Sequence, residues 1–171
     1  VEYNGHSFSL YGDFIYYVSS AESNPKPAST RILYAVNVKT GQEVWKRQIN
    51  SYVRLLNILD GILYYTSREE KTLFALNSLT GEPLWDFDMF VSATGGSRPD
   101  AAKGITIIGV SAPDNQSSGD KLYALDSTSG KVLWTFPASS TTAAVGDAPI
   151  LINNETIYIN FTDYALFNVN D

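Results

Sequence analysis

The sequence predicts an all-β protein assembled from repeated units of four antiparallel strands. Three observations predict this class: one tryptophan-containing motif occurs three times, an alternating apolar run precedes each copy, and no segment sustains the 3.6-residue period of a helix. Gly, Pro, Ser and Thr interrupt the chain throughout. Its 171 residues, 44% of them hydrophobic and 18% charged, are sufficient for one domain with a sizeable core.

The repeated motif has a fixed internal spacing. Its three copies are LYAVNVKTGQEVW at 33–45, LFALNSLTGEPLW at 73–85 and LYALDSTSGKVLW at 122–134. In each copy the tryptophan follows the first leucine by twelve residues and follows the glycine by four. Identical spacing in three copies indicates an internal structural repeat.

Each repeat contains four strand-sized segments separated by turn signals. The first strands are expected at 7–11, 52–58 and 96–101, and the second strands at 13–19, 60–67 and 102–111. The third and fourth strands lie within the motif. The repeats are expected at 6–49, 52–89, 96–137 and, incomplete, 146–171. Four antiparallel strands in about 40 residues are typical of a β-propeller blade, so 1–171 is expected to be a single propeller domain or propeller segment.

The spacing of the motif implies a hairpin that orients the tryptophan. We expect Asn37, Asn77 and Asp126 to start the turn through side-chain bonds to backbone N–H groups. We expect Gly41, Gly81 and Gly130 to end it with positive φ. The aromatic residues placed in this way are Trp45, Trp85 and Trp134. Each is expected to pack on the adjacent blade near one of the alanines at Ala35, Ala75 and Ala124.

The pattern ALxxxTGxxLW, which 75–85 follows, resembles the PQQ-like repeat of quinoprotein dehydrogenases, known for its tryptophan-docking motif. The resemblance extends over almost the whole chain and implies the propeller fold. Relatives range from calcium- and PQQ-dependent alcohol dehydrogenases to scaffolds such as the propeller lipoprotein of the bacterial outer-membrane barrel-assembly machinery. Fold alone does not decide among these functions.

We expect a non-enzymatic, extracytoplasmic propeller module that binds a protein partner or small ligand. Its contacts are expected in the non-repeating segments 20–30, 92–100 and 112–120. No catalytic or metal-ligating residue is predicted and no cofactor is expected, although the resemblance implies PQQ and calcium. One alternative is a segment of a PQQ- and calcium-dependent dehydrogenase, and another is the extracellular sensor domain of a membrane receptor.

Composition argues against several other functions. A net charge of −6 and a pI near 4.7 disfavour binding to nucleic acid or to anionic membranes. The absence of cysteine excludes disulfides and thiolate catalysis, and no 18-residue apolar run predicts a membrane span. The Tyr-rich second strands favour core packing over a carbohydrate-binding face.

Isolated polar residues do not form a recognisable site. His6 is the sole histidine and is expected to be solvated. Asp60, Asp100 and Asp147 match no calcium ligand set, and the oxygen-rich segment 114–120 is expected to be a solvated loop. Sequons at Asn115, Asn154 and Asn160 are about as numerous as chance predicts from the composition, so they do not indicate glycosylation.

The incomplete fourth repeat leaves an open strand edge, which favours association. Residues 1–3 could supply the missing strand within the chain, or could pair with a second copy to complete an eight-bladed homodimer. The chain could also be a fragment of a seven- or eight-bladed parent, and the missing initiator Met agrees with a processed or excised segment. We expect the isolated chain to associate.

Overall fold

The computed structural model describes residues 8–20, 31–49, 53–67, 70–89, 99–110, 121–137, 150–153 and 156–159. All the secondary-structure elements within these ranges are β-strands. The expected positions at His6, Asp147, 1–3, 114–120, Asn154 and Asn160 lie outside the described residues, as do most of the segments 20–30, 92–100 and 112–120.

The strands form three four-stranded antiparallel sheets and one two-stranded sheet. The first sheet contains β1 (Phe8–Tyr11), β2 (Phe14–Ser20), β3 (Arg31–Asn37) and β4 (Glu43–Ile49). The second contains β5 (Val53–Leu59), β6 (Ile62–Ser67), β7 (Thr72–Asn77) and β8 (Pro83–Asp88). The third contains β9 (Asp100–Ala102), β10 (Ile105–Val110), β11 (Lys121–Asp126) and β12 (Val132–Pro137). The fourth consists of β13 (Ile150–Asn153) and β14 (Thr156–Ile159).

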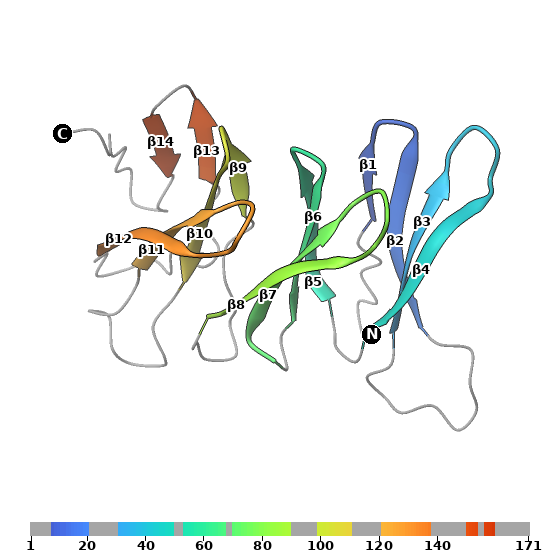
Figure 1. Cartoon of the computed structure of the whole chain (residues 1–171), viewed down its shortest axis with the longest axis horizontal. Coiled ribbons are helices and arrows are strands. Elements are labelled where there is room, and N and C mark those ends of the chain that lie inside the picture. Colours follow the sequence, from blue (N-terminus) through green and yellow to red (C-terminus); the bar gives the residue numbers. More distant parts are fainter. Residues whose placement is uncertain are drawn as a thin grey trace, which may run out of the picture.

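Within each complete sheet the strands follow one another in sequence order, and the sheets stand in a row (Figure 1). Strand β1 lies beside β5, β5 beside β9, and β9 beside β13, so the first strands of all four sheets share one side of the row. This arrangement is that of consecutive propeller blades. The predicted fold class, with three complete units and an incomplete fourth, is confirmed.

The third repeat differs from its predicted strand boundaries. Its second strand was expected at 102–111, but β10 begins at Ile105 because Lys103 and Gly104 form a two-residue turn with φ of 52° and 77°. Its first strand, β9, consequently extends to Ala102, one residue beyond the predicted range. The second repeat differs in the same way, because Asp60 and Gly61 form a turn with φ of 49° and 78° and β6 begins at Ile62 rather than at residue 60.

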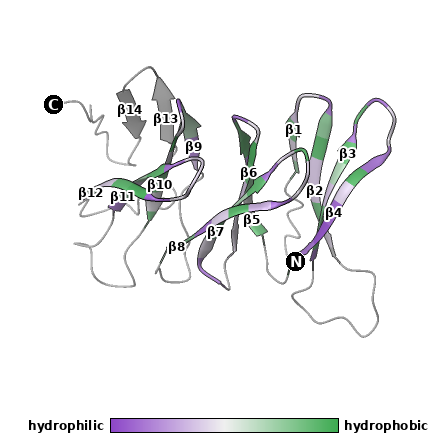
Figure 2. Ribbon diagram, in the orientation of Figure 1, coloured by the Kyte–Doolittle hydropathy of each residue, from purple (hydrophilic) through white to green (hydrophobic). Residues whose placement is uncertain are grey.

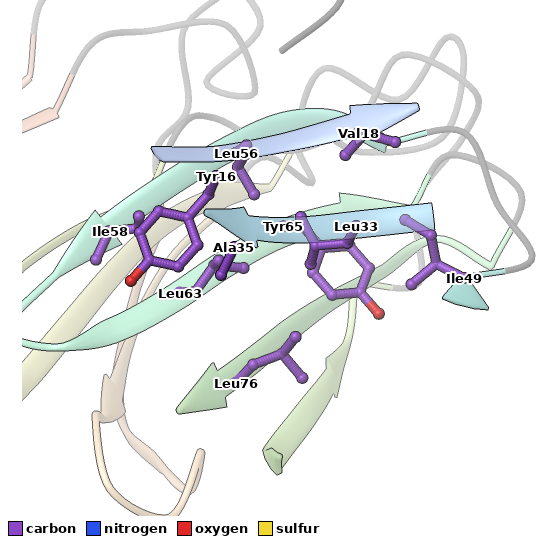
Figure 3. Close-up of a cluster of buried hydrophobic side chains, with 10 residues drawn as sticks. All are labelled: Tyr16, Val18, Leu33, Ala35, Ile49, Leu56, Ile58, Leu63, Tyr65 and Leu76. Carbon is purple, nitrogen blue, oxygen red and sulfur yellow. The ribbon is translucent and has the colours of Figure 1, made fainter. Parts of the chain in front are cut away.

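The hydrophobic core lies between the sheets. One cluster combines Tyr16, Val18, Leu33, Ala35 and Ile49 from the first sheet with Leu56, Ile58, Leu63, Tyr65 and Leu76 from the second (Figure 3). A second cluster joins the second and third sheets around Tyr64, Trp85, Ile108 and Leu125. Apolar residues follow the central strands β2, β6 and β10 (Figure 2). Each interface therefore stabilises the chain by removing apolar side chains of two neighbouring sheets from water.

The strained turn of the third sheet generates a testable prediction. Replacing Lys103 by Asn should raise the free energy of unfolding by up to about 1 kcal/mol, because Asn tolerates positive φ better than Lys. Urea denaturation would measure the change. The matched control is Lys131→Asn, since Lys131 is exposed and does not adopt positive φ. Equal effects of the two substitutions would contradict this explanation.

Candidate functional site

The hairpin between the third and fourth strands has the same construction in all three sheets. The side-chain oxygen of Asn37 accepts hydrogen bonds from the backbone N–H groups of Lys39 and Thr40, at 3.0 and 3.1 Å. Asn77 and Asp126 accept the equivalent pairs of bonds from Leu79 and Thr80, and from Thr128 and Ser129. Hydrogen bonds from the Ser129 hydroxyl and N–H hold the pKa of Asp126 below its ordinary value.

The glycine of each turn adopts a left-handed conformation. Gly41, Gly81 and Gly130 have φ of 69°, 73° and 69°, which non-glycine residues adopt only with strain. A register shift follows in each hairpin, between the third-strand alanine and the residue after it. Each tryptophan thereby lies directly across from the alanine of its own sheet, in the pairs Ala35–Trp45, Ala75–Trp85 and Ala124–Trp134.

The indole of Trp45 reaches the hairpin of the next sheet. Its Nε1–H donates to the backbone carbonyl of Ser78 at 2.9 Å. Its ring covers Gly81 so closely that a Cβ atom there would lie 2.7 Å from the indole Cδ2. Gly81 is therefore required twice, by its backbone conformation and by its contact with the ring.

Trp85 makes the same contact one sheet further along. Its Nε1–H donates to the Ser127 carbonyl at 2.8 Å, and a Cβ atom on Gly130 would lie 2.7 Å from its ring. The alanine expected near each tryptophan is its cross-strand partner within the same sheet, and a glycine is the residue that the indole covers in the adjacent sheet.

A tyrosine of the second strand accompanies each of these indoles. Tyr16 lies 6.0 Å from Trp45 between ring centroids, and its hydroxyl also donates to the Ser78 carbonyl, at 3.1 Å. Tyr64 lies 5.8 Å from Trp85, but its hydroxyl bonds instead to Thr106 Oγ1 at 2.8 Å. Thr106 Oγ1 in turn bonds to Ser127 Oγ at 2.7 Å. Burial raises the pKa of both tyrosines, since the charged phenolate is poorly solvated there.

Among the residues that the structure describes, the first and third motifs each show only half of this contact. No atom of the described part of the chain lies within 4 Å of the position that a Cβ on Gly41 would take. Trp134 is half-buried in β12, and no hydrogen bond joins its indole to another described residue. The residues that complete the contact at Gly81 and Gly130 thus have no described counterpart at Gly41.

The acidic candidates do not converge. Asp60 occupies the exposed turn between β5 and β6, and a side-chain oxygen of Asp100 accepts the N–H of Ala101 at 2.9 Å. Within the described ranges no three His, Cys, Asp or Glu residues are close enough together to hold a metal ion. Asp60 and Asp100 therefore do not belong to a shared acidic cluster in this part of the chain. No helix in the described part is long and apolar enough to span a membrane.

The carbonyl groups that accept the indole hydrogen bonds were not predicted from the sequence. Ser78 and Ser127 act through backbone carbonyls, which any residue type supplies, and Val38 occupies the same motif position in the first repeat. Thr106 was missed as well, because a threonine in a β-strand is ordinary. The recurrence of serine after Asn77 and Asp126 is the only trace of this site in the sequence.

The close contact at Gly81 predicts unequal effects of two alanine substitutions. Gly41→Ala should cost about 1 kcal/mol, because only the backbone conformation is strained. Gly81→Ala should cost about 1–3 kcal/mol more, because the added methyl group would also displace the Trp45 indole. Chemical denaturation would measure both, and equal costs would contradict the described packing.

The two serine carbonyls predict unequal effects of removing an indole N–H. Trp45→Phe leaves the Ser78 carbonyl with the Tyr16 hydroxyl as donor, whereas Trp85→Phe removes the indole donor of Ser127 without a tyrosine in its place. Trp85→Phe should therefore destabilise the protein by about 1 kcal/mol more than Trp45→Phe. Adding Tyr16→Phe to Trp45→Phe should reduce the difference. A larger cost for Trp45→Phe alone would contradict this assignment.

Buried tyrosines predict a loss of stability at alkaline pH. Burial raises the pKa of Tyr65 from 10.0 to about 12. The unfolded chain therefore loses the Tyr65 proton at a lower pH than the folded chain does. Stability should be unaffected below pH 10 by this group and should fall between pH 10 and about 12. Urea denaturation across this range would show a shallower fall for Tyr65→Phe, and an unchanged slope would contradict the assignment.

Comparison with known proteins identifies the family. The family model described as outer membrane protein assembly factor BamB matches residues 9–87 and 69–171. No curated protein sequence matches the chain. Among solved structures, BamB from Moraxella catarrhalis resembles 88% of the chain over 40% of its own length, with a TM-score of 0.61 and 18% identity.

Two further structures share the fold at low identity. A europium-containing methanol dehydrogenase resembles 76% of the chain over 24% of its own length, with a TM-score of 0.55 and 18% identity. The dihydro-heme d1 dehydrogenase NirN resembles 92% of the chain over 32% of its own length, with a TM-score of 0.60 and 10% identity. The chain spans less than half the length of each structure. Since the family model covers nearly every residue, the chain belongs to the family of the outer membrane protein assembly factor BamB, and its PQQ-like repeat is confirmed.

Proposed function

We propose that this chain is a non-enzymatic PQQ-like propeller module, which acts as an interaction scaffold in an extracytoplasmic protein. The proposal is supported by the contacts of the repeated side chains, which are all structural. The tryptophans at 45 and 85 and the tyrosines at 16 and 64 all bond or pack against the next sheet. The asparagines and aspartate of the motif bond their own turns. Residues engaged in this way hold the module together.

We assign the binding of a protein partner or small ligand to the segments that do not repeat. Segments 20–30, 92–100 and 112–120 differ in length and composition between repeats, as expected where the fold imposes little constraint. Each joins strands of rigid sheets, and loops held by a rigid scaffold are common binding elements. Either a protein or a small ligand would be held by several of these loops together.

The extracytoplasmic assignment rests on the family. The family description names an assembly factor for outer membrane proteins, which are assembled outside the cytoplasm. We propose the same location for this chain. Fractionation of cells that express the natural gene would test it, and recovery in the cytoplasmic fraction alone would overturn it.

Loop replacement tests the scaffold role. The wild-type chain and variants with Gly-Ser sequences in place of 21–30, 92–98 or 112–120 would be immobilised and exposed to the extracytoplasmic fraction of the source cells. We expect a partner that the wild type retains and at least one loop variant loses, at unchanged melting temperature. The matched control is Leu79→Ser, an exposed position in a motif turn, which should retain the partner. Retention by every loop variant would overturn the assignment to these loops.

The structural similarity to a methanol dehydrogenase supports a second candidate, a segment of a quinoprotein oxidoreductase. Addition of PQQ with Ca²⁺ separates the two candidates. The scaffold proposal predicts an unchanged melting temperature and no dye-linked alcohol oxidation. A saturable thermal shift together with oxidation would support the dehydrogenase instead.

A further inference from the structure

The two interfaces between neighbouring four-stranded sheets share one contact and differ in their buried hydroxyl groups. The first junction lies between the first and second sheets, and the second junction lies between the second and third sheets. The shared contact is an indole N–H bonded to a serine carbonyl, from Trp45 to Ser78 in the first junction and from Trp85 to Ser127 in the second. These bonds are nearly equal, at 2.9 and 2.8 Å, so a difference between the junctions has to come from the groups around them.

Three hydroxyl groups form a continuous chain in the second junction. Tyr64 Oη lies 2.8 Å from Thr106 Oγ1, which in turn lies 2.7 Å from Ser127 Oγ. Tyr64 and Thr106 are 0% exposed and Ser127 is 6% exposed. The backbone carbonyl of the same Ser127 holds the Trp85 indole, and the Trp85 ring packs against Tyr64. The three hydroxyls, called the hydroxyl network below, therefore connect both sides of the Trp85 contact.

The first junction contains the two ends of this network but not its middle. The ends are Tyr16 and Ser78, which occupy the equivalent positions in their own repeats. Leu63 occupies the position of Thr106, since each is the second residue of its strand and pairs with a leucine of the next strand. Leu63 packs beside Tyr16 in the core between the first two sheets (Figure 3). An apolar side chain thus stands where the second junction has a hydroxyl.

The missing middle leaves the Ser78 hydroxyl without a partner. Ser78 is 0% exposed, and its Oγ has no hydrogen bond within the described part of the chain. Tyr16 does not satisfy it, because the Tyr16 hydroxyl donates to the Ser78 carbonyl instead. A buried hydroxyl without a partner retains the full cost of its removal from water. Thr66 Oγ1 is the other such hydroxyl among the described residues, and it bonds to neither set of groups.

The two indoles differ in burial in the same direction. Trp85 is 9% exposed, whereas Trp45 is half-buried. Opening of the Trp45 contact would also hydrate the unpaired Ser78 hydroxyl, which offsets part of the bonds that are lost. Opening of the Trp85 contact would hydrate hydroxyls that are already paired, so it recovers no such cost. Local opening is therefore expected to be easier at Trp45.

We propose that the hydroxyl network of Tyr64, Thr106 and Ser127 holds the Trp85 contact closed, and that neighbouring sheets first separate at the Trp45 contact, which lacks this network. Thr106 determines where the network forms, because a tyrosine and a serine are present in both junctions. This conformational device goes beyond the scaffold role and involves none of the loops assigned to partner binding, so the two proposals fail independently.

Hydrogen exchange of the indole N–H protons tests the proposal, because each proton exchanges when its own contact opens. NMR spectra of the chain would follow the signals of Trp45 and Trp85, each identified by its loss in the corresponding Trp→Phe variant. We expect the Trp85 proton to exchange at least ~10-fold more slowly than the Trp45 proton, since its contact opens only with the hydroxyl network. Equal exchange rates, as global unfolding alone would give, would overturn the proposal.

Substitution of Thr106 separates the network from general stability. Thr106→Val removes the central hydroxyl and keeps the shape of the side chain. It should accelerate exchange of the Trp85 proton at least ~5-fold relative to that of the Trp45 proton. Thr106→Ser keeps the hydroxyl and is the matched control, with a smaller expected effect. Equal acceleration of both protons by Thr106→Val would overturn the role of the network.

Position 63 supplies the reciprocal test. Leu63→Thr should complete a second network with Tyr16 and Ser78, whereas Leu63→Val has the same shape without a hydroxyl. Both variants lose part of the leucine side chain, so the comparison is made between them. We expect the Trp45 proton to exchange at least ~3-fold more slowly in Leu63→Thr than in Leu63→Val, and we expect no difference once Ser78→Ala is added. The same rate in the two variants would overturn the role assigned to Thr106.

The two serines should respond in opposite ways to loss of their hydroxyls. Ser127→Ala breaks the network and should accelerate exchange of the Trp85 proton. Ser78→Ala removes a hydroxyl that has no described partner, so exchange of the Trp45 proton should stay the same or become slower. Comparable acceleration by both substitutions would show that the Ser78 hydroxyl is also bonded, and would overturn the proposed difference between the junctions.

Discussion

The hydrogen bond from an indole N–H to a carbonyl in the next sheet's hairpin is the contact on which the rest of this structure depends. It requires a glycine beneath the ring, a small residue opposite the tryptophan and a turn that presents the carbonyl. Each requirement appears in the repeat at a constant position. Burial of the surrounding apolar side chains supplies most of the stabilisation, while this contact determines how neighbouring sheets are aligned.

The sequence was sufficient to predict the hairpin because its determinants are residue types. A glycine with positive φ, an asparagine or aspartate that bonds the turn, and a tryptophan four residues after the glycine are all visible in the motif. Strand pairing then follows from the register. The turns at Asp60–Gly61 and Lys103–Gly104 escaped prediction because each directly precedes an apolar run and was included in the strand expected there.

The acceptor half of the contact could not be predicted in the same way. A backbone carbonyl leaves no signature in residue type, as the serine at 78 and the valine at 38 show. A glycine in this turn is already explained by its positive φ. The sequence therefore does not indicate that Gly81 lies beneath an indole whereas Gly41 does not. The structure of the candidate loops could not be predicted for a different reason. These segments do not repeat, so they cannot be aligned with one another to identify residues that share a role.

The contact has a direction, because the tryptophan leaves one face of a sheet and the glycine turn lies on the other. The row of sheets therefore possesses polarity, like a head-to-tail polymer whose subunits all point the same way. Addition or loss of one repeat leaves every remaining junction chemically unchanged. The number of sheets in a ring is then decided by the angle between neighbours, so duplication of a repeat can enlarge such a protein without a new interface.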